Sequence, residues 1–382
     1  MRPIPFVMSC AVLAVSAVAL PLVGQDGDNV PATREALGEL LFFDTDLSAN
    51  RTQSCASCHD PAYAFADPRG MASPGDDGVS LGDRNAPTAA YARYSPSFFV
   101  DDEGVAHGGQ FLDGRAGTLE DQAGGPPLNP LEMGMKDEAA VVARLREDPI
   151  YEAAFPAIFG DGVLDDTATA YTAMTQAIAA FERTETFAPF DSKYDRWLRG
   201  EAELTDEEEL GRLLFFSQQF TNCAECHKLA ASQMDPEETF TDYSFHNIGV
   251  PTNTALRAQN GVDPAYVDMG LGGGDHLDDP AEAGKFRTPT LRNVAITAPY
   301  MHNGVFEDLR TVVLFYNKYN TRSDARQINP ETGAPFGPAP VPETLSLEEL
   351  EIGPALDDRR IDALVAFLET LTDARYEPLL ED

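Results

Sequence analysis

Apolar residues recur at helical spacing in two similar segments of the chain. Residues 37–43 read LGELLFF and residues 210–216 read LGRLLFF. In both segments the apolar positions fall three and four residues apart, which is typical of a helix with one buried face. Thr205, with Glu208 three residues later, forms a capping box that begins the second of these helices.

A third amphipathic pattern lies near the end of the chain and predicts a closing helix. Its apolar positions are Ile361, Leu364, Val365, Leu368 and Leu371. The alternation of apolar and polar residues that is typical of strands is sparse throughout the chain. We therefore predict a mostly α fold.

The first 24 residues have the pattern of a secretory leader. Arg2 precedes an apolar stretch from Ile4 to Val23, and polar residues follow it, in the order of an export signal. Cleavage after Ala19 or after Gly24 would fit. The alternative is an uncleaved membrane anchor, since the stretch is just long enough to span a bilayer. We expect a periplasmic protein that is exported and soluble after residues 1–24 are removed.

Two five-residue motifs carry the candidate chemistry. Residues 55–59 read CASCH and residues 223–227 read CAECH. This spacing is typical of c-type haem attachment, in which two thiols on one turn bond the porphyrin and the following histidine binds the iron. A zinc site is the alternative for a Cys-x-x-Cys pair, but zinc does not require histidine at the fifth position twice. We therefore expect Cys55, Cys58, His59, Cys223, Cys226 and His227 to bind two haems, with the two histidines as iron ligands.

The chain also repeats itself around these motifs. Each LGxLLFF segment precedes a haem motif, and residues 111–119 align with residues 301–309 at a constant offset of 304 − 114 = 190. A chain of 382 residues is long enough for two domains. We predict two cytochrome c-like domains, residues 30–195 and 200–375, each carrying one covalently bound c-type haem.

The charge of the chain limits its partners. The formal net charge is −36, from 63 acidic and 27 basic residues. Such a chain would repel nucleic acid and anionic membrane surfaces, and it favours a basic redox protein as partner. Alternatively, the acidic residues simply keep an exported protein soluble.

Several further segments resemble those of one enzyme family. They are residues 84–88 (RNAPT), 113–116 (DGRA), 128–133 (LNPLEM), 245–251 (FHNIGVP) and 286–304. With the two haem motifs, and in this order, they resemble the bacterial di-haem cytochrome c peroxidase and MauG family over essentially the whole mature chain. The resemblance implies reduction of hydrogen peroxide at an open N-terminal haem, with electrons passed through the C-terminal haem.

The resemblance also implies the sixth iron ligand of the second haem. In the family this ligand follows the Pro-Tyr-x-His segment by fourteen residues, so 302 + 14 indicates Tyr316, a tyrosine as in MauG. An anionic tyrosinate would stabilise ferric iron. Two alternatives remain: Met301 is the ligand, or Tyr316 is a core tyrosine on the apolar face of a helix that also carries Leu309 and Val312.

The repeat predicts a different environment for the first haem. The offset carries Tyr316 onto Pro126, since 316 − 190 = 126, and proline has no side-chain donor atom. By resemblance, Gln122, Pro126 and Glu132 are the catalytic residues of an open pocket, and Glu132 is the general acid and base for peroxide cleavage. Alternatively, Glu132 is an exposed glutamate at the entry of a helix.

Two positions depart from the family pattern. Many family peroxidases carry a distal histidine in the loop equivalent to residues 75–83, which here contains none, so the first haem is expected to be open without prior reduction. His107 is the alternative distal ligand. Leu112 stands where the family has a tryptophan between the haems, and Phe111, His302 or direct tunnelling would have to serve instead.

The resemblance implies calcium and redox partners as well. In the family a calcium ion lies between the haems, and its ligands correspond to Asn85, Thr297 and Pro299; neutral oxygens suit such a hard cation. The electron donor would be a small redox protein, a cytochrome c or a cupredoxin, or else the side chains of a protein substrate. A homodimer is an assembly that the resemblance allows. The alternative function is a non-catalytic di-haem electron-transfer cytochrome, against which Gln122, Glu132 and the missing distal histidine argue.

Overall fold

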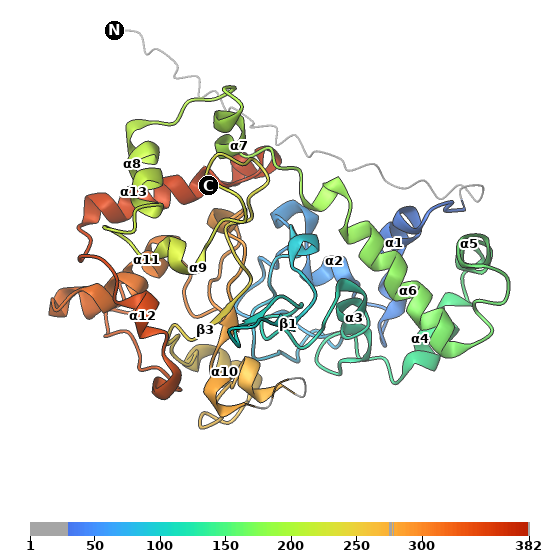
Figure 1. Cartoon of the computed structure of the whole chain (residues 1–382). Helices are drawn as coiled ribbons and strands as arrows, with labels where there is room; N and C mark the ends of the chain where they lie inside the picture. Colours follow the sequence, from blue (N-terminus) through green and yellow to red (C-terminus); the bar gives the residue numbers. More distant parts are fainter. Residues whose placement is uncertain (1–29, 275–276, 278, 381–382) are drawn as a thin grey trace, which may run out of the picture.

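The computed structural model describes residues 30–274, 277 and 279–380, and most of its regular structure is helical (Figure 1). The α-helices are α1 (Arg34–Phe43), α2 (Cys55–Cys58), α3 (Leu119–Ala123), α4 (Glu138–Leu145), α5 (Pro149–Phe159), α6 (Thr167–Glu182), α7 (Lys193–Leu198), α8 (Asp206–Phe215), α9 (Cys223–Cys226), α10 (Thr254–Asn260), α11 (Leu309–Asn317), α12 (Leu347–Leu350) and α13 (Asp358–Glu369). The prediction of a mostly α fold is confirmed, and the predicted leader, residues 1–24, lies outside the described residues.

Short strands form two antiparallel pairs in the middle of the molecule. Strand β1 (Phe99–Val100) pairs with β2 (Ala106–His107), and β3 (Phe245–His246) pairs with β4 (Phe286–Arg287). A bridge between His107 and Ser244 links one pair to the other. The strands therefore help to join segments that are far apart in sequence.

Helices α1 and α6 cross at a glycine in the first half of the molecule. Thr33 caps α1 by accepting a hydrogen bond from the backbone N–H of Ala36 at 3.2 Å. A Cβ atom on Gly38 would lie 1.9 Å from the carbonyl oxygen of Ala177 on α6. Only glycine allows the two helices to approach this closely.

Helices α8 and α13 repeat this arrangement in the second half. The predicted capping box is confirmed, because Thr205 accepts from the backbone N–H of Glu208 at 3.2 Å while the Glu208 carboxylate accepts from that of Thr205 at 2.7 Å. A Cβ atom on Gly211 would lie 1.8 Å from the carbonyl oxygen of Ala363 on α13. The predicted closing helix corresponds to α13, and its core-facing residues include Ile361 and Leu364.

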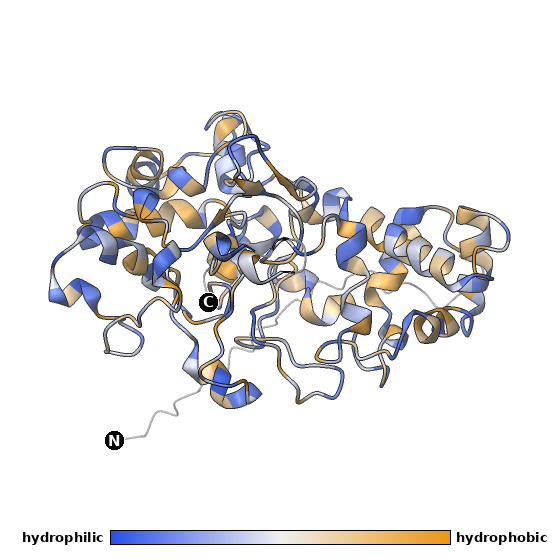
Figure 2. Ribbon diagram, turned by 60° about the horizontal axis from the view of Figure 1, so that its bottom comes forward, coloured by the Kyte–Doolittle hydropathy of each residue, from blue (hydrophilic) through white to orange (hydrophobic). Residues whose placement is uncertain are grey.

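Each half has a hydrophobic core of its own. One cluster of buried residues extends from Leu37 to Ala188, and another extends from Tyr194 to Leu371. Figure 1 shows α1, α4, α5 and α6 gathered on one side of the molecule and α8, α11 and α13 on the other. In Figure 2 the helices carry both apolar and polar residues, as amphipathic packing requires. Among the described residues no helix combines the length and apolar character needed to span a bilayer.

Ion pairs join the two halves. The Arg84 guanidinium contacts the carboxylates of Asp113 at 2.6 Å and of Asp268 at 2.7 Å. The backbone N–H of Asn85, beside Arg84, donates to the carbonyl oxygen of His302 at 2.8 Å. Residues of the first half are thereby held against residues of the second.

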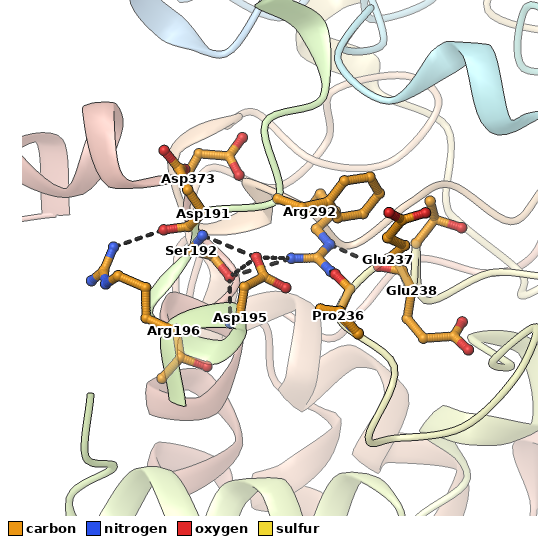
Figure 3. Close-up of polar contacts among 12 residues, drawn as sticks. Asp191, Ser192, Asp195, Arg196, Pro236, Glu237, Glu238, Arg292 and Asp373 are labelled. Carbon is orange, nitrogen blue, oxygen red and sulfur yellow. Dashed lines mark hydrogen bonds and ion pairs between the residues drawn. The ribbon is translucent and has the colours of Figure 1, made fainter. Parts of the chain in front are cut away.

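A buried arginine organises the junction near α7 (Figure 3). The Arg292 side chain is fully buried and pairs with Asp195 at 2.6 Å, while its Nε donates to the carbonyl oxygen of Glu238 at 2.8 Å. The Ser192 hydroxyl donates a hydrogen bond to the same Asp195 carboxylate at 2.6 Å. Hydrogen bonds to both members stabilise a buried ion pair that would otherwise be costly to desolvate.

Candidate haem sites

A cavity of about 350 Å³ is lined by residues from both halves. His59 and Gln122 contribute from the first half, and His227 and Tyr316 contribute from the second. The interior of the molecule therefore brings together the two motif histidines and two of the residues predicted to lie opposite them.

The first haem motif forms a single helical turn. Helix α2 spans the two cysteines, and His59 follows at its C-terminal end. The backbone N–H of Ser54 donates to the Ser57 hydroxyl at 3.0 Å, which helps to begin the turn. The Nδ1 atom of His59 lies 3.2 Å from the carbonyl oxygen of Phe65, so the ring donates there and its Nε2 remains available as a ligand.

The second motif has the same construction. Helix α9 spans its two cysteines, and the Nδ1 atom of His227 lies 2.9 Å from the carbonyl oxygen of Phe240. Burial lowers the pKa of His227 to about 4 and also lowers the pKa of His59. Both rings are therefore neutral at ordinary pH, which is the form that binds a metal.

These residues fit covalently attached haem. Cys55, Cys58, Cys223 and Cys226 are free thiols, so the four cysteines that the structure describes are not consumed by disulfides. Each pair lies on one turn directly before a tethered, neutral histidine. Thioether bonds and an axial histidine require this combination of groups.

Tyr316 lines the cavity from helix α11. Tyr316 is half-buried, and within the described part of the chain its phenol oxygen makes no hydrogen bond. Burial is the main cause that raises the pKa of Tyr316, and the thiols of Cys226 and Cys223 contribute. Met301, the alternative ligand, lines the same cavity with a left-handed backbone at φ 72°.

The internal repeat extends to backbone geometry. The bridge between Gln110 and Ala116 recurs at the same offset between Tyr300 and Phe306, and α3 and α11 begin 190 residues apart, since 309 − 119 = 190. The two helices differ in length, however. Helix α3 ends at Ala123, and Pro126 begins a short 3₁₀ turn, whereas α11 continues past Tyr316 to Asn317.

Glu132 is a partly buried carboxyl beside the first half's motif. Its Oε1 accepts a hydrogen bond from the Asn129 side chain at 2.8 Å. Burial raises the pKa of Glu132, although Arg115 and Asn129 oppose the shift. A carboxyl with a raised pKa suits proton transfer near neutral pH. Gln122 lines the cavity, whereas Glu132 and Pro126 are not among its lining residues.

The predicted region between the haems is packed with aromatic side chains. Leu112 lines the cavity and accepts a hydrogen bond on its carbonyl oxygen from the backbone N–H of Arg287 at 2.8 Å. His302 stacks on Phe286 with ring centroids 3.7 Å apart. The Arg115 guanidinium lies 3.6 Å from the ring centroid of Phe111.

His107, the alternative distal ligand, is held away from the cavity. Its Nε2 contacts the carboxylate of Asp101 at 3.1 Å, and its Nδ1 lies 3.2 Å from the carbonyl oxygen of Asp242. Both ring nitrogens are thereby engaged, and His107 is not among the residues that line the cavity.

Asn85, Thr297 and Pro299, the predicted calcium ligands, line the same cavity. The peptide bond between Ala298 and Pro299 is cis, and Thr297 precedes it. Within the described residues no group of three or more histidine, cysteine or acidic side chains is arranged to hold a metal ion. A cation at this position would therefore depend on neutral oxygen ligands.

Sequence reasoning missed Glu182, the last residue of α6. Its side chain lines the cavity together with His59 and Gln122. The motifs contained no signal for it. An alignment of α6 with α13 would have revealed a glutamate at a position that is apolar in the second half.

Comparisons with known proteins identify the family of the chain. Residues 32–203 match the family model described as di-haem cytochrome c peroxidase. The methylamine utilization protein MauG of Paracoccus denitrificans is 54% identical over 97% of this chain and 97% of its own length. The cytochrome c peroxidase Ccp of Escherichia coli is 32% identical over 92% of this chain and 60% of its own length.

Solved structures are similar as well. The crystal structure of the diheme peroxidase BthA from Burkholderia thailandensis matches with a TM-score of 0.76 and 35% identity, over 90% of this chain and 87% of that one. Because likeness of this degree extends over nearly the whole chain, in sequence and in fold, the protein belongs to the di-haem cytochrome c peroxidase and MauG family of oxidoreductases.

Proposed function

We propose that this protein is a periplasmic di-haem peroxidase that reduces hydrogen peroxide at an open N-terminal haem with electrons passed through the C-terminal haem. The two separate cores support two cytochrome c-like domains, residues 30–195 and 200–375. The apolar leader at residues 1–24 supports export. The family of the chain supports the peroxidase chemistry.

The proposed ligand sets differ between the two haems. Cys55, Cys58 and His59 would hold the first, and Cys223, Cys226, His227 and Tyr316 would hold the second. When bound, the haems supply the electron-transfer and peroxide-reducing chemistry. The observation that carries the proposal is the contrast at equivalent positions: Tyr316 contributes a phenol without a hydrogen-bond partner in the described residues, and Pro126 contributes no donor atom.

Side chains of the first half would transfer a proton between the two oxygens of the substrate. The Glu132 carboxylate takes a proton from one peroxide oxygen and returns it to the other, which helps the O–O bond to break. The Asn129 amide orients that carboxylate through its hydrogen bond. The Gln122 carboxamide, which lines the cavity, donates a hydrogen bond to the peroxide, and Pro126 leaves room for it.

The remaining proposals concern a metal ion and the source of electrons. We propose a calcium ion held by Asn85, Thr297 and Pro299, supported by their positions along one cavity. The net charge of −36 supports a basic redox protein as donor, either a small cytochrome or a cupredoxin. The similarity to MauG supports a protein substrate as the other source of electrons.

Stopped-flow absorption tests the proposal. The oxidised protein is mixed with stoichiometric hydrogen peroxide, beside a Glu132→Gln variant and a Glu152→Gln control, since Glu152 is exposed on α5. We expect a rapid change in haem absorbance without prior reduction, slowed about 100-fold or more in Glu132→Gln and unchanged in the control.

Other outcomes would contradict parts of the proposal. A reaction only after one haem is reduced would indicate a hidden distal ligand at the first haem. No reaction in any redox state, with electron paramagnetic resonance that shows only low-spin iron, would indicate a non-catalytic electron carrier.

A further inference from the structure

Glu182 is a buried carboxyl with an unpaired oxygen. The residue is 5% exposed, and its Oε2 atom has no hydrogen-bond partner among the residues that the structure describes. Buried polar groups are nearly always hydrogen-bonded, so an orphaned carboxyl oxygen requires an explanation. The side chain lines the same cavity as His59 and Gln122, and a ligand of that cavity is a candidate partner.

The internal repeat gives the residue of the second half that is equivalent to Glu182. The helix crossings pair Ala177 with Ala363, an offset of 363 − 177 = 186. The same offset carries Glu182 onto Leu368, which is 7% exposed and lines the cavity from α13. The second half thus fills this position with a leucine of its core. The carboxyl of the first half has no packing reason to be there.

The surroundings of Glu182 favour its uncharged form. Burial raises the pKa of Glu182 to about 8, and of the two charged groups that act on it Arg183 lowers the pKa while Glu120 raises it. Arg183 is engaged elsewhere, because it forms two hydrogen bonds with the Glu120 carboxylate, at 2.6 and 2.8 Å. A neutral carboxylic acid can donate a hydrogen bond, whereas a carboxylate can only accept one.

Glu182 also lies near the first haem motif. Burial is the main cause that raises the pKa of the Cys55 thiol, and the charge of Glu182 is the next cause. Helices α6 and α3 pack together, and α3 carries Gln122. The carboxyl therefore lies near the attachment site of the first haem, on a helix that packs against the helix of Gln122.

We propose that Glu182 is a second proton-donating residue of the first haem pocket, which delivers its carboxyl proton to an oxygen ligand bound there. The inference rests on the proposed function. Reduction of peroxide follows H₂O₂ + 2e⁻ + 2H⁺ → 2H₂O, and the electrons come from the protein redox donor. The shuttle through Glu132 moves a proton between the two oxygens and supplies none. The oxygen that leaves as the first water carries both protons of the substrate, so the two further protons are needed by the oxygen that remains. Glu182 supplies one of these two protons to the remaining oxygen, becomes a carboxylate, and is reprotonated from solvent.

Infrared difference spectroscopy with cyanide tests the position and protonation of Glu182 without turnover. The oxidised protein is compared before and after addition of potassium cyanide, as wild type, Glu182→Gln and Glu185→Gln. Glu185 is the control because it is exposed and does not line the cavity. We expect a band of a protonated carboxylic acid that shifts when cyanide binds in wild type and control, and that is absent in Glu182→Gln. A band that does not respond to cyanide would overturn the proposal.

Peroxide kinetics complete the test. We expect Glu182→Gln and Glu182→Leu, the second of which copies Leu368, to slow the reaction at least about tenfold while haem content and helical circular dichroism stay unchanged. Wild-type rates in both variants would overturn the inference and leave the proposed function intact. If wild type ignores peroxide while the cyanide-sensitive band persists, the proposed function fails and the position of Glu182 in the pocket stands.

Discussion

At the scale of single residues, the two halves differ at one pair of equivalent positions, Tyr316 and Pro126. Tyr316 lies on α11 and lines the cavity, whereas Pro126 begins a 3₁₀ turn after α3 has ended. A phenol can bind iron, and a proline ring cannot. Under the proposed function, this difference within a repeated framework would separate an electron-transferring haem from one that is open to substrate.

Replacing Tyr316 by Met tests the proposed ligand. We expect the reduction potential of the second haem to rise, because an anionic tyrosinate stabilises ferric iron more than a thioether does. Spectroelectrochemical titration measures the potential. Tyr319→Phe is the matched control, since the Tyr319 hydroxyl donates to the carbonyl oxygen of Ile248 at 2.9 Å and has a structural role. An unchanged potential and spectrum in Tyr316→Met would instead indicate Met301 as the ligand.

At the scale of secondary-structure elements, each half contains one pair of crossed helices, α1 with α6 and α8 with α13. In each half a helix that precedes the haem motif crosses a later helix at a glycine, Gly38 against Ala177 and Gly211 against Ala363. In the first half α1 also packs against α2, so this crossing helps to position the Cys-x-x-Cys-His motif there. The sequence LGxLLFF is thus a packing motif as well as a helix signal.

Gly38→Ala tests the close crossing. The added methyl group would overlap the Ala177 carbonyl, so we expect the free energy of unfolding to fall by about 1–3 kcal/mol. Gly82→Ala is the control, because a Cβ atom there meets no atom within 4 Å and its backbone is not left-handed. Urea denaturation followed by circular dichroism measures both. Equal stability of the two variants would show that α1 and α6 can separate without cost.

At the scale of the whole molecule, ion pairs of Arg84 hold the two halves together. Arg84 contacts Asp113 from its own half and Asp268 from the other half. Burial alone would raise the pKa of both carboxyls, but Arg84 outweighs it, together with Arg115 at Asp113, and holds both values below the ordinary 3.8. A carboxyl whose folded-state pKa is lowered stabilises the fold above its ordinary pKa and loses that contribution as pH falls through the folded-state value.

Arg84→Gln tests this junction. At about pH 7 we expect the variant to lose roughly 3 kcal/mol of unfolding free energy, because two buried carboxylates lose their common partner. On acidification below about pH 4 the wild type should lose the same contribution, so the difference between the two proteins should shrink. Thermal unfolding at both pH values measures it. A difference that does not depend on pH would contradict the assignment of these ion pairs.

Local signals were sufficient for several features. The haem motifs, the capping box at Thr205 and the apolar face of α13 each depend on residues close together in sequence. Such features follow from helical periodicity and from the reach of one turn, which are the same wherever the segment lies. The offset of 190 residues could likewise be read directly, and it recurs in the backbone bridges.

Only the tertiary structure decided which distant residues meet. Arg84 and Asp268 are 184 residues apart, and Glu182 reaches the cavity because α6 crosses α1. Neither contact has a local signal in the sequence, since burial and long-range pairing depend on how the helices pack. The sequence by itself determined the helices α1, α8 and α13, the two Cys-x-x-Cys-His motifs and the repeat. The packing decided which side chains face the cavity, because that depends on contacts between residues far apart along the chain.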